Sequence, residues 1–163
     1  MTGRSLALLA AGGSAVLLLG AFGFQALGYA PCQLCLWQRW PHAVAMGAGA
    51  FALTGVAVAF WALAGALSAL TTAGIGLYHT GVERGFWEGP QACSAGGTLS
   101  GLSGADLLST EGASDVIRCD EVAWAFAGLS MASWNAVLSL GLAGLWIAAM
   151  VRFGRARRNR PRT

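Results

Sequence analysis

The chain alternates between long apolar stretches and polar segments. No charged residue lies between Ser5 and Ala30 or between Arg39 and Glu83. A helix of about 20 apolar residues crosses the hydrocarbon layer of a membrane. The first stretch therefore predicts one spanning helix, and the second, about twice as long as one crossing needs, predicts two helices joined by a turn near residues 61–64. With the last long apolar stretch, the predicted spans are residues 6–27, 42–60, 64–81 and 129–151.

These spans predict an all-α membrane protein, a four-transmembrane-helix bundle that forms a single domain over residues 1–163. The predicted extramembrane parts are two cysteine-bearing loops, about residues 28–41 and 82–128, and a basic tail, residues 152–163. A secretory signal peptide is the alternative for the first span, because Arg4 precedes the apolar run. That run is longer than a usual signal-peptide core and no convincing cleavage site follows it, which favours a span.

Composition and charge support a membrane protein and give it an orientation. The chain is 56% hydrophobic and only 10% charged, whereas soluble domains are about 25% charged. Most arginines lie in the tail from Arg152 to Arg162, and all the acidic residues lie between Glu83 and Glu121. The positive-inside rule then predicts cytoplasmic termini and cysteine loops on the oxidising outer side. The charge separation indicates topology and not binding of nucleic acid.

A C-x-x-C motif lies between the first two predicted spans. Residues three apart share one helical face, so Cys32 and Cys35 can form a redox-active disulfide. Arg39 follows Cys35 by four residues and shares that face, where its charge would favour a thiolate and attract a polar, electron-accepting head group. The alternative for Arg39 is an interfacial arginine that extends its charge to the membrane surface.

The second cysteine pair, Cys93 and Cys119, lies in the long predicted loop. A structural disulfide between them is one interpretation. A zinc site that combines them with Cys32 and Cys35 is another, less favoured because structural zinc sites usually use two closely spaced pairs. Disulfide exchange is the third interpretation, and it is favoured because the loop between Cys93 and Cys119 is rich in glycine and can move one of its thiols towards the C-x-x-C motif.

Several other residues permit two interpretations each. His42 and His79 lie near predicted span ends, where a lone histidine is usually only solvated. The leucines from Leu99 to Leu108 would form either a patch on the membrane or a small loop core. The tryptophans are expected to be interfacial anchors; these are Trp37, Trp40 and Trp87 in the loops, and Trp134 and Trp146 near the two ends of the last span.

Taken together, the chain resembles the DsbB family of disulfide-bond formation proteins. The resemblance covers nearly the whole chain. It rests on four spans, on Pro31 before the C-x-x-C motif, on Arg39, on Tyr78 and His79 followed by Gly81, Val82 and Glu83, and on Cys93 and Cys119. It implies an enzyme of the bacterial inner membrane, a protein-disulfide oxidoreductase that reoxidises a DsbA-like thioredoxin-fold partner in the periplasm. Ubiquinone or menaquinone would be the electron acceptor.

The resemblance also implies a role for each site residue. A reduced partner would attack Cys93 and break a Cys93–Cys119 disulfide, after which Cys119 would attack Cys32. The Cys35 thiolate released in this way would donate to the quinone, beside Arg39 and His79. The implied catalytic residues are Cys32, Cys35, Cys93 and Cys119, the implied quinone-binding residues are Cys35, Arg39 and His79, and no metal is implied.

Two alternatives to this function use the same spans. A vitamin K epoxide reductase-like oxidoreductase also combines four spans, a C-x-x-C motif, loop cysteines and a quinone, but its loop pair precedes its close pair, the reverse of the order here. The other alternative is a non-catalytic four-span scaffold in which the loop disulfide is purely structural.

Overall fold

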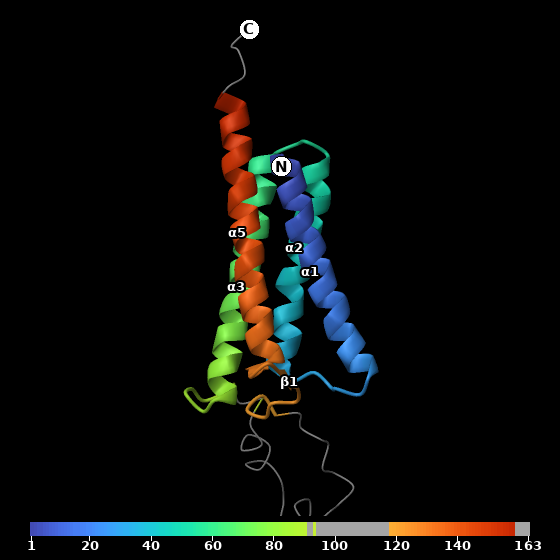
Figure 1. The fold of residues 1–163 in the computed structure, drawn as a ribbon, viewed down its shortest axis with the longest axis vertical. Helices are drawn as coiled ribbons and strands as arrows, with labels where there is room; N and C mark the ends of the chain where they lie inside the picture. The colour runs from blue at the N-terminus through green and yellow to red at the C-terminus, as the bar shows by residue number, and fades with distance from the viewer. Residues whose placement is uncertain (91–92, 94–117, 159–163) are drawn as a thin grey trace, which may run out of the picture.

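The computed structural model describes residues 1–90, 93 and 118–158. Its helices lie side by side along the long axis of the molecule and form a bundle (Figure 1). The start of α1 and the end of α5 lie at one end of this bundle, and a small hairpin lies at the other (Figure 1). The described helices are α1 (Gly3–Ala26), α2 (Gln33–Leu53), α3 (Val58–Glu83) and α5 (Met131–Arg158).

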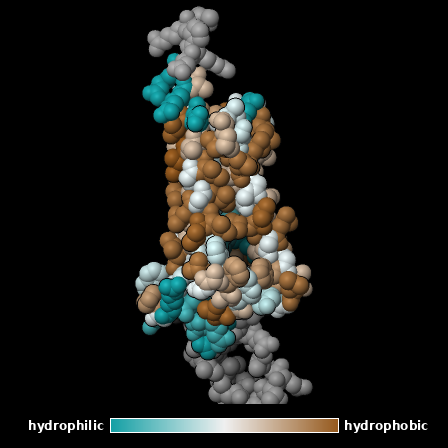
Figure 2. Space-filling model, viewed as in Figure 1, coloured by the Kyte–Doolittle hydropathy of each residue, from teal (hydrophilic) through white to brown (hydrophobic). Residues whose placement is uncertain are grey.

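Three of the described helices are long and apolar enough to cross a membrane: Gly3–Ala26, Val58–Glu83 and Met131–Ala156. The remaining helix, α2, has the length but is not apolar enough, because Gln33, Gln38 and Arg39 lie in its first turns. The helical bundle is thus confirmed, whereas three of the four predicted spans meet the criterion for a crossing. The visible face of the bundle is mostly hydrophobic between two hydrophilic ends (Figure 2), as a surface in contact with lipid would be.

Helix α2 begins earlier in the chain than the second predicted span. Cys32 forms the N-cap of α2, and its sulfur accepts a hydrogen bond from the Cys35 amide. The helix begins at Gln33 and continues through Pro41. Residues 33–41, which were expected in a loop, are therefore helical. Pro41 does not end the helix, because a proline in a membrane helix removes only one backbone hydrogen bond.

The turn between α2 and α3 was also misplaced. It lies at residues 54–57 and not at 61–64. Gly55 has a φ of 78° and Ala57 a φ of 48°, so the backbone reverses through two left-handed residues. Trp61, expected in the turn, is helical and stacks on Phe51 with ring centroids 4.5 Å apart.

Small residues allow the helices to pack closely. The core consists mainly of buried alanines, and a side chain at Gly65 would meet the indole of Trp146. Trp146 is fully buried, so the expectation that it is an interfacial residue was wrong. Without a side chain at residue 65, the α3 backbone can approach the ring of a neighbouring helix.

A short antiparallel hairpin precedes α5, pairing β1 (Ala125–Phe126) with β2 (Leu129–Ser130). Ala127 and Gly128 both have positive φ, as a two-residue hairpin turn of type I′ requires. The hairpin lies at the end of the bundle where α2 and its cysteine motif begin (Figure 1). Leu99 to Leu108, with their expected patch, lie outside the described residues.

Candidate redox-active site

All four cysteines gather at one end of the bundle. Cys93 and Cys119 form a disulfide, whereas Cys32 and Cys35 are free thiols. Cys32, Cys93 and Cys119 belong to one buried cluster, and Cys35 packs against it. The structure therefore brings together two pairs that lie far apart in the sequence, which is the arrangement that disulfide exchange between them needs.

The start of α2 holds the C-x-x-C motif in a geometry that favours a thiolate. The two sulfurs are 3.1 Å apart, and the Cys35 amide donates to the Cys32 sulfur over 3.3 Å. The hydrogen bond with the Cys35 thiol lowers the pKa of Cys32 to about 4; His79 and the Cys35 amide also lower it, and burial opposes them. Cys32 is therefore the better nucleophile and leaving group of the reduced pair.

His79 lies beside the thiols and is only 3% exposed. Its Nε2 lies 3.5 Å from the Cys32 sulfur and 3.9 Å from a carboxylate oxygen of Glu83. Glu83 in turn accepts a hydrogen bond from the Ser130 hydroxyl. The alternative of a solvated interfacial histidine was wrong, because Cys32 and Gln38 of α2 and Glu83 of α3 surround the ring.

A group of buried polar residues continues from His79 into the bundle, and the sequence reading missed most of it. Gln38 and His42 lie four residues apart on α2, and both are buried. They contact Thr72 of α3 and Asn135 of α5. Two polar residues at a helical spacing in an apolar stretch were the available signal. Thr72 and Asn135 gave none by themselves.

Arg39 points towards α1 and is anchored there by three contacts. Its guanidinium donates to the side chain of Gln25 over 2.8 Å and to the carbonyl of Ala21 over 3.5 Å, and it lies 4.7 Å from the ring centroid of Phe22. Its Nε is buried and has no hydrogen-bond partner among the described residues. A buried, unpartnered donor is costly in a protein and suits a ligand that carries an acceptor oxygen.

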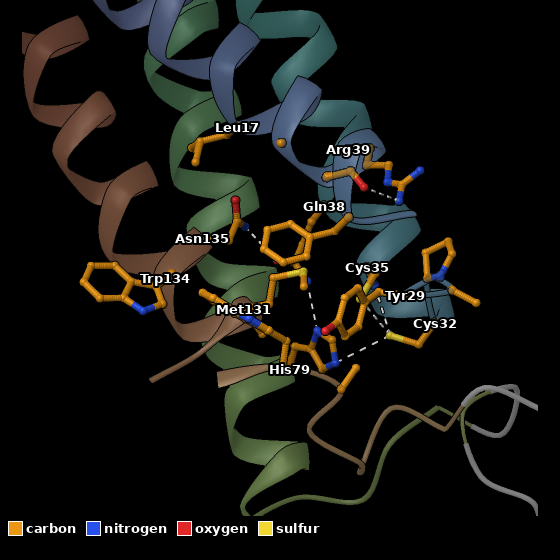
Figure 3. A pocket seen from close by; sticks show the side chains of 18 of the residues that line it. Leu17, Tyr29, Cys32, Cys35, Gln38, Arg39, His79, Met131, Trp134 and Asn135 are labelled. Carbon is orange, nitrogen blue, oxygen red and sulfur yellow. Dashed lines mark hydrogen bonds between the residues drawn. The ribbon is translucent and has the colours of Figure 1, made fainter. Parts of the chain in front are cut away.

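A cavity of about 510 Å³ joins these residues. Its volume is typical of a site for a small organic molecule. Apolar side chains of α1, the hairpin and α5 form most of its wall, and its polar lining includes both thiols, Arg39 and His79 (Figure 3). The cavity can therefore take a largely apolar ligand that presents an acceptor group to Arg39.

The zinc alternative does not fit the loop pair, because Cys93 and Cys119 are joined in a disulfide and offer no thiolate. The ligand atoms of Cys32, Cys35 and His79 lie within 4.8 Å of one another. This set offers three possible metal ligands, which is fewer than a structural zinc site uses.

The comparisons with known proteins agree with this geometry. The family "Disulfide bond formation protein DsbB" matches residues 3–149. A disulfide bond formation protein B of Acidovorax sp. (strain JS42) is 31% identical, over 93% of this chain and 89% of its own length. Those of Verminephrobacter eiseniae and Polaromonas naphthalenivorans are each 32% identical; the matches cover 93% and 90% of this chain, and 86% and 90% of the relatives. No solved structure matches. With its two cysteine pairs side by side and a family match over nearly its whole length, the chain belongs to the DsbB family of disulfide bond formation proteins and is a disulfide oxidoreductase.

Proposed function

We propose that this protein is an inner-membrane thiol oxidase that reoxidises a periplasmic, thioredoxin-fold, DsbA-like disulfide donor and passes the electrons to membrane quinone. The observation that carries the proposal is the position of the two cysteine pairs. A disulfide and a dithiol share one buried cluster, and the dithiol also lines a largely apolar cavity. Electrons can thus enter at the loop pair and leave at the C-x-x-C motif.

The cysteines pass the disulfide to the partner in a series of thiol–disulfide exchanges. A thiolate of the reduced partner attacks Cys93, so that a partner–Cys93 bond forms and the Cys93–Cys119 bond breaks. The second thiolate of the partner then attacks the partner sulfur in this mixed disulfide, which releases the oxidised partner and the Cys93 thiolate. Cys119 attacks Cys32 of an oxidised C-x-x-C pair and releases Cys35 as a thiolate. Attack of Cys93 on Cys119 then restores the loop disulfide and releases Cys32.

The cavity residues fit a quinone. The buried Nε of Arg39, which has no partner in the part of the chain that the structure describes, is a donor for a carbonyl oxygen. Cys35 and His79 line the same cavity, and the apolar walls suit a ring and the start of an isoprenoid tail. A bound ubiquinone or menaquinone would supply a two-electron, two-proton acceptor. Cys32 and Cys35 supply the electrons when they return to a disulfide.

The same proposal places the protein in the membrane. All four helices would cross it, with the termini in the cytoplasm and the cysteine pairs in the periplasm. The exposed arginines at the end of α5 support this orientation through the positive-inside rule. For α2, the support is indirect: its polar residues Gln38 and His42 face the interior of the bundle and not lipid.

The test uses the purified protein in detergent with ubiquinone or menaquinone and a reduced thioredoxin-fold dithiol protein. Loss of quinone absorbance, dependent on the dithiol protein, is the expected result. Cys35→Ser should abolish it. Cys93→Ser should abolish oxidation of the partner but leave one quinone reduction per protein after chemical reduction of Cys32 and Cys35. No turnover with either quinone would contradict the proposal and leave the scaffold alternative.

A further inference from the structure

A continuous series of side-chain hydrogen bonds runs from the middle of the bundle to Cys32 (Figure 3). In order, it joins His42 Nε2 to Asn135 Oδ1 (2.9 Å), Asn135 Nδ2 to Gln38 Oε1 (2.7 Å), Gln38 Nε2 to His79 Nδ1 (3.0 Å) and His79 Nε2 to the Cys32 sulfur (3.5 Å). Three helices contribute to it, and neither catalysis by cysteines nor a quinone site by itself explains it.

Main-chain carbonyls fix the direction of this series. Gln38 Nε2 also contacts the carbonyl oxygen of Leu34 over 3.1 Å. A carbonyl can only accept, so this side of the Gln38 amide must be the NH₂ group. Its oxygen is then on the other side and must accept from Asn135.

A second carbonyl fixes Asn135 independently. The Thr72 hydroxyl donates to the carbonyl of Gln38 over 3.1 Å, so its proton is committed there and its oxygen can only accept. Asn135 Nδ2, 3.1 Å from that oxygen, must therefore be a donor. Its Oδ1 is left to accept from His42 and from Ser139. Both amides thus have one orientation that satisfies every contact.

This direction determines the protonation of His79. Because Gln38 Nε2 donates to Nδ1, that nitrogen must carry the lone pair, and the proton of a neutral ring is on Nε2. The groups that face Nε2 agree: the Cys32 sulfur and the Glu83 carboxylate are both acceptors when ionised, and Cys35 lies behind Cys32. No described neighbour of His79 requires the other tautomer.

We propose that Gln38 and Asn135 are positioning residues that lock His79 in the neutral tautomer protonated at Nε2, so that the ring donates a hydrogen bond to the Cys32 sulfur. His79 then does not take the thiol proton, because its free lone pair faces Gln38. Its function is to stabilise negative charge on Cys32. In the exchange proposed above, on which this role depends, Cys93 attacks Cys119 and the Cys119–Cys32 bond breaks. Cys32 leaves as a thiolate, and a donor beside that sulfur makes it a better leaving group.

The tautomer can be measured without any redox partner. The chain has 2 histidines, so ¹⁵N-histidine labelling in detergent gives two sets of ring signals, which a His42→Gln variant assigns. A two-bond nitrogen–proton correlation spectrum distinguishes the tautomers. In the reduced protein we expect His79 as a neutral ring protonated at Nε2. A His79 ring protonated at Nδ1 would overturn the proposal.

Two variants of Gln38 test the lock. Gln38→Glu replaces the NH₂ donor by an acceptor of the same shape, so we expect His79 to shift to the Nδ1-protonated tautomer. Gln38→Met removes the donor without burying a charge and should make both tautomers detectable. Gln33→Glu and Gln33→Met are matched controls in the first turn of α2 and should leave the spectrum unchanged. An unchanged His79 tautomer in both Gln38 variants would overturn the lock.

The effect on the thiol is measured in a Cys93→Ala/Cys119→Ala background, in which the ultraviolet absorbance of the thiolate reports Cys32 and Cys35. Gln38→Glu should lower the thiolate fraction at a fixed acidic pH about tenfold, the size of one hydrogen bond to a charged group. Gln33→Glu should not. A shifted tautomer with an unchanged thiol titration would overturn the role in stabilising Cys32. Since neither measurement uses quinone or partner, failure of the oxidase assay would leave both results intact.

Discussion

Cys32 carries more of the chemistry than its spacing from Cys35 reveals. It is the N-cap of α2, it accepts from the Cys35 amide, and His79 of α3 lies beside its sulfur. Each contact stabilises a negative sulfur, and the helix start adds a partial positive charge. The C-x-x-C spacing predicts the thiol pair, but the histidine contact depends on how α2 and α3 pack.

The first prediction concerns the titration of Cys32. Its pKa is lowered to about 4 from an ordinary value of 9.0, with the Cys35 hydrogen bond as the main cause. The thiolate therefore stabilises the reduced protein fully only above the ordinary value of 9.0, and this stabilisation declines progressively as the pH falls from there to about 4. In reduced Cys93→Ala/Cys119→Ala protein, thiolate absorbance should persist at pH values well below 7 and disappear in acid.

The control for this titration is Cys35→Ala in the same background. It removes the principal donor, so the midpoint should move towards the ordinary thiol value. If the titration midpoint of Cys32 were that of an ordinary cysteine even with Cys35 present, the Cys35 hydrogen bond, the helix start and His79 would not stabilise the thiolate.

The second prediction concerns Arg39. Lysine keeps the charge but cannot reproduce the fork that reaches Gln25 and Ala21, nor the Nε donor. We expect Arg39→Lys to raise the KM for quinone about tenfold, as the loss of one hydrogen bond from a charged group does. Oxidation of a partner by the Cys93–Cys119 disulfide in a single turnover should be unchanged. Arg84→Lys, at the exposed end of α3, is the control. An unchanged KM would return Arg39 to the role of an interfacial arginine.

At the scale of elements, hydropathy predicts how many helices there are better than where they turn. The four helices lie close to the predicted stretches, but the interval from Arg39 to Glu83 holds no charge that could mark a turn. Backbone conformation at Gly55 and Ala57 marks it instead. The first loop was predicted to extend to about residue 41, but α2 begins at Gln33 and continues through Pro41 inside the bundle.

The third prediction concerns helix packing. Glycines in a membrane span allow helices to approach closely, and the structure separates those that do so from those that do not. A side chain at Gly65 would clash with the Trp146 ring, whereas one at Gly74, on the same helix, meets nothing within 4 Å. Gly65→Ala should therefore lower the free energy of unfolding by about 1–3 kcal/mol through overpacking.

Gly74→Ala is the matched control and should be neutral or slightly stabilising, because alanine restricts the unfolded chain. Unfolding in mixed detergent micelles, followed by helical circular dichroism, measures both. Equal stabilities of the two variants would show that α3 moves away from Trp146 at little cost.

At the scale of the whole molecule, the reactive cysteines and the basic residues lie at opposite ends of the bundle. The hairpin lies at one end of the bundle (Figure 1), where a hydrophilic surface is visible (Figure 2). The cysteine cluster lies at the same end, at the start of α2 and the end of α3, and Asp120 and Glu121 follow Cys119 directly in the sequence. Arg4 and the arginines that end α5 lie at the other. The sequence predicts this separation from charge alone. Whether α2 crosses the membrane is a different matter, because its composition does not meet the criterion for a span and only its packing favours a crossing.

The fourth prediction tests that crossing with two single cysteines in a background without the native four. Leu27→Cys and Thr54→Cys lie at exposed positions just before and just after α2. If α2 spans, an impermeant maleimide added to intact spheroplasts should label Leu27→Cys, and should label Thr54→Cys only after permeabilisation. If α2 lies on the outer side, both label without permeabilisation.

Because Gln38 and His42 face α3 and α5 and not lipid, a crossing buries the inner part of the hydrogen-bond series, from His42 to Gln38, at membrane depth. There its members cannot exchange their partners for water, which is the condition under which a fixed histidine tautomer can persist through turnover.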